Sequence, residues 1–441
     1  MPSGLFFVIR NCYDHLQTKT AAMVKETSKW LKVAKRGSQM STNCYFRKIN
    51  MIIYALIWSI IIGMVTAAYL NLVNWVINLV WHEYLRSSRG LNCWYPFIIC
   101  IPAGFLIGFL SQHLGDYPLT IEEVLTQFRL HGRLNYHHWW KSFALGLLVL
   151  AAGGSIGPEA STTVLTGSMI NWLGDRLRWA RFCLSSGQAK RIWLRKMDQQ
   201  QLKKAPTFSQ LFESKRQRLL SVVLLVIIGI SGAALVFKLF PEEGVFGIHH
   251  HLISWQWTNL WTAIPAILVG LVFGKVFIWL ANWSALMIDV KLNRIWQGGI
   301  FGLIIAASSW LSGDILFSGE FRIVPFTHEA LKLTVPFLIM VAVIKAIITN
   351  LGFAMGWRGG TIFPAIFSSL AIGVACALLL PGDVRINAVI VLTTSLTVIL
   401  GKPLLASLLI ILLVPVELTP VILVAALLTN QLVSKLPTRR H

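Results

Sequence analysis

The sequence contains few charged residues and, in particular, few acidic ones. Only 13% of its 441 residues are charged and 55% are hydrophobic, and its 39 Lys and Arg outnumber 18 Asp and Glu. A soluble globular domain carries about 25% charged residues. The shortage of charge therefore excludes an ordinary soluble domain. It indicates an integral membrane protein that crosses the bilayer several times, which we place in the cell (inner) membrane.

The sequence also lacks the motifs of metal sites and of common enzymes. Its six cysteines show no CxxC or CxxH spacing. Three consecutive histidines, His249 to His251, cannot all face one ion from regular structure, and we interpret them as part of a solvated loop. No P-loop, GxSxG or HExxH motif occurs. We therefore expect no metal, no cofactor and no enzymatic activity.

Long apolar runs occur along most of the chain, and several are interrupted by Gly or Pro. The runs 51–81, 219–240 and 260–288 exceed the roughly 20 residues that a membrane-spanning helix needs, whereas 143–152 and 299–311 are shorter. Interrupted segments are tolerated at membrane depth only where protein or a water-filled cavity covers the freed backbone groups. The pattern predicts an all-α polytopic membrane protein with broken half-helices.

The basic residues are concentrated in two segments. Residues 1–50 contain nine Lys and Arg against two acids, and residues 174–218 contain twelve against three. The positive-inside rule places both in the cytoplasm. We attribute this charge to contact with the lipid bilayer and expect no binding of nucleic acid. The predicted organisation is a basic cytoplasmic N-terminal segment 1–50, a transmembrane domain 51–434 that includes a basic cytoplasmic loop 175–218, and a short cytoplasmic tail 435–441.

Two Gly-rich stretches point to a binding site. They are GGSIGPEAS (153–161) and GWRGGTIFPAIFSS (356–369), and each places a Pro where it favours the first turn of a helix. A helix that begins inside the membrane presents free backbone N–H groups and the positive end of its dipole. Glycines let those amides approach an ion closely. Two such helix ends, if they converge, form a site for an anion.

The candidate site residues follow from these stretches. Lys345 and Arg358 lie at membrane depth or at its edge and would raise the local positive potential, although Lys345 could instead extend toward the interface. Glu159 either stabilises the start of its own helix or acts as a gate. The backbone N–H groups expected to bind the anion are those of Ser155, Ile156, Gly157, Gly360, Thr361 and Ile362.

The two stretches resemble the motifs of the chloride channel and transporter (CLC) family, GREGP and GxFxP, each of which opens a half-helix aimed at the anion. Residues 154–158 match the first motif and residues 360–364 the second. The stretch GDYPLTIEEVL falls where the family has its first anion-binding turn, so Gly115 and Asp116 become anion-binding candidates. The resemblance implies chloride as the transported ion, a homodimer with one pore per subunit, and two inverted halves at about 51–240 and 260–434.

The chain departs from the family pattern at the gate. The gating glutamate of the family is the third residue of GREGP, which is Ile156 here. Glu159 lies three residues later, nearly on the same helix face but about 4.5 Å farther along the axis. We therefore expect a voltage-independent or weakly gated anion channel that conducts chloride passively. The alternatives are a proton-coupled chloride antiporter that uses Glu159, and a transport-inactive membrane scaffold or sensor, which the loss of two apolar helices to a polar run at 187–218 suggests.

Overall fold

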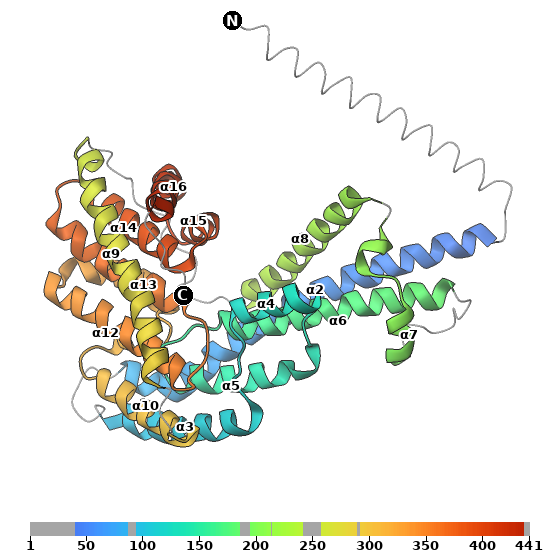
Figure 1. Ribbon diagram of the computed structural model, residues 1–441, viewed down its shortest axis with the longest axis horizontal. Helices are drawn as coiled ribbons and strands as arrows, with labels where there is room; N and C mark the ends of the chain where they lie inside the picture. Colours follow the sequence, from blue (N-terminus) through green and yellow to red (C-terminus); the bar gives the residue numbers. More distant parts are fainter. Residues whose placement is uncertain are drawn as a thin grey trace, which may run out of the picture. The chain divides into compact units, whose positions relative to one another are not determined.

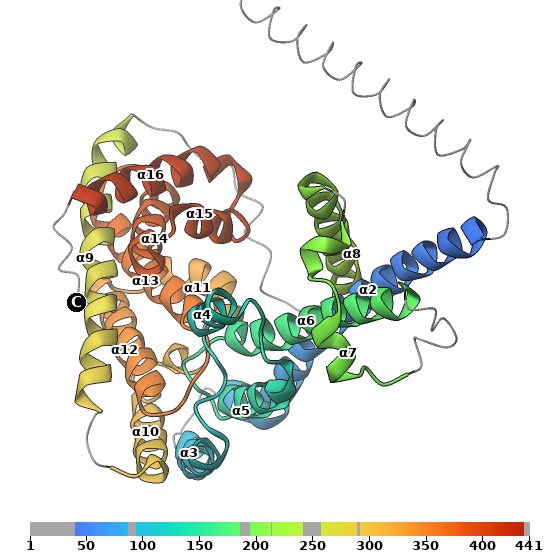
Figure 2. The ribbon, with the colours of Figure 1, turned by 45° about the vertical axis from the view of Figure 1, so that its right-hand side comes forward.

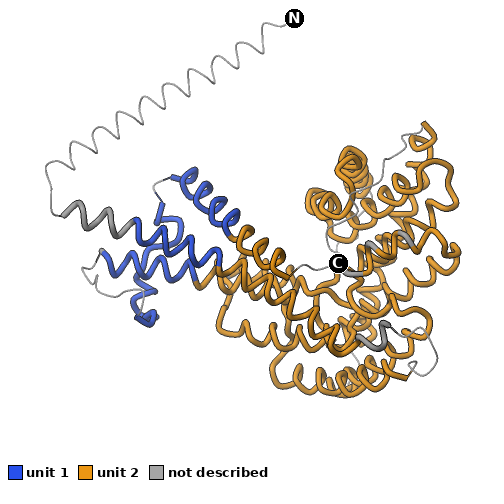
Figure 3. Tube along the Cα trace, turned by 180° about the vertical axis from the view of Figure 1, so that it is seen from behind, with its two compact units in different colours: residues 1–60, 173–228 blue, residues 61–172, 229–441 orange. Residues whose placement is uncertain are grey.

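The structure is a computed structural model that describes residues 40–86, 94–185, 195–212, 214–240, 257–288 and 292–435. The chain divides into two compact units, residues 1–60 with 173–228 (unit 1) and residues 61–172 with 229–441 (unit 2) (Figure 3). Most of the predicted N-terminal segment, the three histidines and nearly all of the predicted tail lie outside the described residues. The predicted halves and the membrane orientation stay predictions.

The regular structure of the described residues is α-helical, as predicted, and the one pairing of β type is an isolated bridge between two glycines. Three helices contribute residues to both units: α2 (Met40–Arg86), α6 (Glu159–Ser185) and α8 (Lys215–Leu239). The other helices of unit 2 are α3 (Tyr95–Leu114), α4 (Ile121–His131), α5 (Trp139–Ala151), α9 (Thr258–Met287), α10 (Arg294–Ser308), α11 (Ile323–Glu329), α12 (Val335–Ala354), α13 (Ile362–Leu379), α14 (Val384–Leu400), α15 (Pro403–Ile411) and α16 (Thr419–Lys435) (Figure 1).

Unit 1 contains a short helix, α7 (Gln199–Lys204), that packs on the end of α6. Trp179 of α6 is buried and donates a hydrogen bond from Nε1 to the Gln201 side-chain oxygen at 3.0 Å. Leu173, Leu177 and Ala180 are also buried at the three- and four-residue spacing of a helix face, which explains why α6 continues to Ser185. The segment predicted as a basic loop, 175–218, is therefore helical in part.

Among the described residues, seven helices are long and apolar enough to cross a membrane by length and composition. They are α2, α3, α8, α9, α12, α13 and α16. This finding confirms the prediction of a polytopic membrane protein. Of these seven, α13 is the most enclosed by other helices, and it is apolar on all sides, as expected for a helix in the centre of a bundle.

Unit 2 is organised around α13 and α14. Helix α9 lies alongside α12, α13 and α14, and α12 and α14 also pack on α13 (Figures 1 and 2). Phe367 and Ala371 of α13 and Val391 of α14 are fully buried in the core that these helices share. The first residues of α13 are thereby held in a fixed place, and they form one side of the candidate site.

A second close helix pair, α3 and α10, supports the site from another direction. A Cβ atom on Gly104 would lie 2.3 Å from the Gly298 carbonyl oxygen, so only glycine allows the two backbones to approach this closely. The Gly298 carbonyl also accepts a hydrogen bond from Trp357 Nε1 at 3.1 Å. Trp357 is fully buried and lies just before the second Gly-rich motif. The α3–α10 pair thus anchors that motif.

Candidate anion-binding site

The two Gly-rich motifs form the turns that precede two helices. The first turn joins α5 to α6, and the second joins α12 to α13. Gly153 and Gly356 occupy the same place in their turns, directly after the preceding helix, and have φ angles of +85° and +90°. Residues other than glycine rarely adopt this left-handed conformation. Helix α6 begins at Glu159, one residue after Pro158, and α13 begins at Ile362, two residues before Pro364, so both starts lie close to the predicted positions.

The two turns meet through their central glycines. Gly157 N donates to Gly360 O at 2.7 Å, and Gly360 N donates to Gly157 O at 2.9 Å. The predicted convergence of the two motifs is thus present in the structure. However, the N–H group of each of these glycines donates to the carbonyl oxygen of the other, so in this conformation neither N–H is free to bind an anion.

The side chain of Glu159 lies between the two helix starts. Its Oε1 accepts hydrogen bonds from Ile362 N at 2.8 Å and from Phe363 N at 3.4 Å, the first two amides of α13. Its Oε2 is buried and has no hydrogen-bond partner in the described part of the chain. Glu159 is itself the first residue of α6, yet its carboxyl group occupies the N-terminus of the opposite helix. The carboxyl group also interacts with the backbone N–H of Glu159 itself at the start of α6, so both roles predicted for it stay predictions.

These hydrogen bonds offset part of the cost of removing the carboxylate from water. Hydrogen bonds to a charged acceptor contribute about 1.5–3 kcal/mol each, and a negative charge at a helix N-terminus adds about 0.3–1 kcal/mol. An anion at the same amides would gain the same interactions. The carboxylate of Glu159 therefore occupies the place that the half-helix offers to an anion.

Gly157 and Gly360 provide the space for this carboxyl group. A Cβ atom on Gly157 would lie 1.8 Å from Glu159 Oε2, and one on Gly360 would lie 1.9 Å from Glu159 Cδ. Both distances are far below a normal van der Waals contact. The sequence predicted that these glycines would admit an anion to the backbone, and the structure shows that they admit a carboxyl group.

Ile156, at the family's gate position, is buried against the second motif. Its side chain is 1% exposed and packs on Gly359, where an added Cβ would lie 2.0 Å from Ile156 Cδ1. Its N–H donates to Gly154 O at 2.8 Å. Neither its side chain nor its N–H is available to a ligand. The prediction that Ile156 binds an anion through its N–H is not supported by this geometry.

Ser155 and Thr361 keep free N–H groups. Neither has a hydrogen-bond partner for its backbone N–H among the residues that the structure describes. The Ser155 hydroxyl lies 3.0 Å from the hydroxyl of Thr349 on α12, which ties the first motif to the helix that leads into the second. Of the predicted anion ligands, these two keep an unoccupied N–H among the described residues, whereas the N–H of Ile362 is occupied by Glu159.

Lys345 is fully buried on α12 and does not extend toward the interface. Its Nζ donates to the carbonyl oxygens of residues 314, 315, 316 and 317 at 2.7, 3.3, 3.4 and 3.0 Å. It also lies 4.9 Å from the ring centroid of Phe367. Phe317 N in turn donates to Gly153 O at 3.0 Å. Lys345 therefore holds the segment 314–317 against the first motif. The N–H donors of its ammonium group all bind carbonyl oxygens of this segment.

Arg358 links the second motif to the turn that follows α3. Its Nη1 donates to Asp116 O at 2.5 Å, and its Nη2 pairs with Glu123 Oε1 at 2.6 Å. Gly115 ends α3 with a hydrogen bond from its N–H to Ser111 O, and the Asp116 carboxylate faces Arg294 at 3.3 Å. The Gly115–Asp116 turn is thus tied to the second motif by Arg358, whose charge Glu123 balances.

Three residues of this region were not predicted: Glu123, Thr349 and Phe363. The stretch TIEE has the capping-box pattern, and Glu123 does accept from Thr120 N at 2.7 Å at the start of α4. That pattern could have placed Glu123 at a helix start but not beside Arg358. Phe363 contributes only its backbone amide, and the identity of its side chain gives no indication of that role.

Comparisons with known proteins agree with this architecture. The family described as voltage gated chloride channel matches residues 212–434. A search of curated proteins finds no significant match. Among solved structures, a CLC-type fluoride/proton antiporter superposes with a TM-score of 0.62 at 16% identity, over 88% of this chain and 96% of that one.

Two further solved structures are similar in fold. A slow cyanobacterial Cl⁻/H⁺ antiporter gives a TM-score of 0.59 at 18% identity, over 88% of this chain and 95% of that one. A eukaryotic CLC transporter gives 0.58 at 14% identity, over 88% of this chain and 72% of that one. The family match covers more than half of the chain and includes the second motif, and the fold similarity covers 88% of the chain. The chain belongs to the voltage-gated chloride channel (CLC) family, as a multi-pass integral membrane protein of anion transport.

Proposed function

We propose that this protein moves a small inorganic anion, chloride by default, past the starts of α6 and α13, and that the carboxyl group of Glu159 is the gate. The observation that carries the proposal is the hydrogen bonding of Glu159 Oε1 to the N–H groups of Ile362 and Phe363. These amides belong to a half-helix whose N-terminus favours negative charge. A carboxylate and an anion cannot occupy them at the same time.

Protonation of Glu159 gives the gate a means of opening. A neutral carboxyl group accepts hydrogen bonds from backbone amides less strongly than a carboxylate does, because it has lost the charge that strengthens them. Its Oε2 has no partner among the described residues that would hold it in place. We propose that proton uptake releases the side chain, and that an anion then binds the N–H groups of Ile362, Phe363 and Thr361. Anion movement is thereby linked to proton movement.

This proposal favours proton-coupled transport over the passive channel that Ile156 suggested. Ile156 cannot take up a proton, but Glu159 reaches the amides of α13 from its own position. The solved structures with a similar fold include a fluoride/proton antiporter and a Cl⁻/H⁺ antiporter, which supports the same choice. The family's gate would then be present in this chain, three residues later than usual.

The test is simultaneous measurement of chloride and proton flux from liposomes that contain the purified protein. The wild type should move chloride with a proportional counter-movement of protons. Glu159→Gln should still move chloride but no longer move protons, since the amide cannot titrate. Glu122→Gln is the matched control, because Glu122 is an exposed acid at the start of α4. It should behave as the wild type.

Two results would overturn the proposal. Chloride flux without proton movement, equal in the wild type and in Glu159→Gln, would show a passive channel. An absence of chloride flux from every sample that retains folded protein would show a scaffold or sensor.

A further inference from the structure

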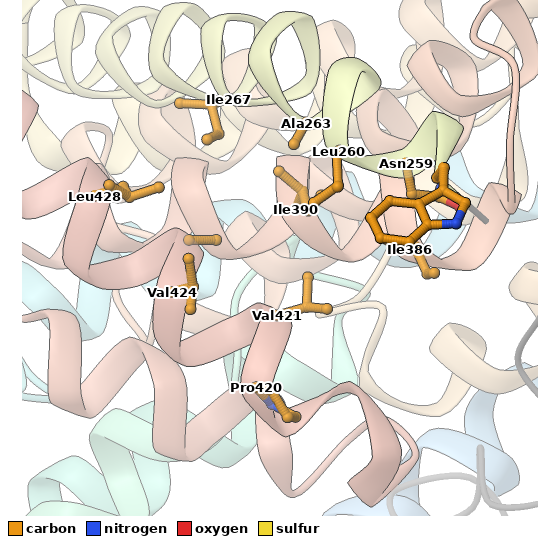
Figure 4. A pocket seen from close by; sticks show the side chains of 12 residues that line it. Asn259, Leu260, Ala263, Ile267, Ile386, Ile390, Pro420, Val421, Val424 and Leu428 are labelled. Carbon is orange, nitrogen blue, oxygen red and sulfur yellow. The ribbon is translucent and has the colours of Figure 1, made fainter. Parts of the chain in front are cut away.

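An apolar groove runs between α9, α14 and α16, away from the two Gly-rich motifs. Helices α9 and α16 both pack extensively on α14 but barely touch each other, which leaves a cavity of about 570 Å³ between them. Ile386 and Ile390 of α14 are buried at its floor. Leu260 of α9 and Val424 of α16 line it from the two sides and are 64% and 56% exposed (Figure 4). The groove is therefore open along its length.

The surroundings of the groove indicate what can fill it. Both α9 and α16 are long and apolar enough to cross a membrane, so a groove between them faces lipid. Its lining is aliphatic except at one end, where Trp257 and Asn259 contribute. Its volume lies within the range of about 300–1,000 Å³ that small-molecule sites occupy. An aliphatic, laterally open groove of this kind suits a single hydrocarbon chain.

The polar end of the groove has the features of the membrane interface. Trp257 and Trp261 at the start of α9 are 85% and 78% exposed, as in the aromatic belts at the level of lipid head groups. Asn259 is buried, and its Oδ1 accepts from Asp383 N at 3.4 Å. Asp383 lies directly before α14, whose residue Ile386 lines the groove. The interface end of α9 therefore meets the start of α14.

A cation is present at this same end. Arg385 binds the Asp383 carboxylate through Nε at 3.1 Å and Nη2 at 2.8 Å, and its side chain is 39% exposed. Its Nη1 has no hydrogen-bond partner in the described part of the chain. The ion pair fixes the guanidinium and leaves donors for an external acceptor. Guanidinium groups bind phosphate well because their N–H donors match its oxygens.

We propose that the groove is a binding site for one phospholipid, with an acyl chain between α9 and α16 and the phosphate at Arg385 Nη1. The apolar lining suits the chain, and the tryptophans and the guanidinium at the start of α9 and α14 suit the polar end of a phospholipid. This site does not involve Glu159. It is a specific lipid site beside α14, which itself packs on α13.

The test uses the full-length protein in nanodiscs that contain a phosphatidylglycerol with a diazirine in its acyl chain. After illumination, mass spectrometry maps the labelled residues. Bulk lipid also reaches Ile264 and Leu268, which are exposed on the same helix outside the groove, so the proposal predicts that the half-buried groove residues Ala263 and Ile267 are labelled more strongly than these two exposed residues. This wild-type pattern tests the proposal without any substitution.

Two variants sharpen the test. Ala263→Trp fills the groove and should remove the concentrated labelling, whereas Ile264→Trp, a matched control at the neighbouring exposed position, should leave it unchanged. Arg385→Gln should weaken retention of the lipid in native mass spectrometry about tenfold, as expected for the loss of one hydrogen bond to a charged group.

Three outcomes would overturn the proposal. Labelling spread evenly around α9 would show ordinary bulk lipid. If the groove residues were not labelled by the lipid and were instead cross-linked to residues 241–256, the chain itself would fill the groove. Cross-links between two copies through α9 and α16 would show a protein interface.

Discussion

Gly157 and Gly360 exchange both of their backbone hydrogen bonds, at 2.7 and 2.9 Å, although one lies in each half of the chain. This double contact fixes the starts of α6 and α13 relative to each other. The Glu159 carboxyl group lies directly beside it, in a space that a side chain on either glycine would fill. The proposed gate is thus enclosed by the same two residues that join the motifs.

Replacement of Gly360 by Ala should block transport. The new Cβ would lie 1.9 Å from Glu159 Cδ and 2.2 Å from Glu159 Oε1. It would therefore fill the volume in which the carboxyl group lies and in which, by our proposal, the anion binds. Overpacking of this kind costs about 1–3 kcal/mol, and we expect chloride flux from liposomes to fall about tenfold or more. Gly313→Ala is the control, since no atom lies within 4 Å of its added Cβ. Equal flux in both variants would contradict the assigned space.

Replacement of Lys345 by Met should lower stability. Methionine is unbranched like lysine and one heavy atom shorter, and it leaves the carbonyls of 314–317 without their buried donor. Leaving a buried hydrogen-bonding group without its partner costs about 1–3 kcal/mol. We expect a clear drop in the thermal midpoint of the detergent-solubilised protein. Lys332→Met, at an exposed position, should leave the midpoint unchanged. If Lys345→Met had the same thermal midpoint as the wild type, the role of Lys345 in holding the segment 314–317 would be wrong.

The Arg358–Glu123 pair should contribute to stability and have little effect on anion affinity. The ions are 2.6 Å apart, and Arg358 has a side-chain exposure of 12%. In a double-mutant cycle of Arg358→Gln and Glu123→Gln, the coupling in unfolding free energy should be about 1 kcal/mol. Because Glu123 already balances the guanidinium, chloride affinity should change little in the double variant. A large loss of affinity there, with no coupling in stability, would restore the role of Arg358 as a source of positive potential for the anion.

Much of the architecture could be predicted from local features of the sequence. Apolar runs of sufficient length indicated the spanning helices, and the Gly-Pro pair at 157–158 and the Gly-Gly pair at 359–360 with Pro364 indicated where α6 and α13 begin. Both features are local. The need for internal backbone hydrogen bonds in lipid, and the backbone angles that Gly and Pro allow, are each determined within a few residues, so a short stretch of sequence is enough to recognise them. The convergence of the two helix starts followed from the family resemblance.

The contacts across the site could not be predicted. The distance of Glu159 from the anion was judged along the axis of its own helix, whereas its carboxyl group reaches across to the amides of α13. Arg358 was expected to act as a free charge, and only the fold brings Glu123 to it. The direction of a long side chain and the identity of its distant partner depend on tertiary packing, which no local pattern encodes.

The central claim is that the Glu159 carboxylate and the transported anion compete for the amides of Ile362 and Phe363. The most direct test is calorimetric measurement of chloride affinity as a function of pH, in the wild type and in Glu159→Gln. The wild type should bind chloride more tightly as the pH falls, because protonation frees the amides. Glu159→Gln should bind chloride tightly at every pH, with no such dependence. The claim would be contradicted if the two proteins showed the same affinity and the same pH profile.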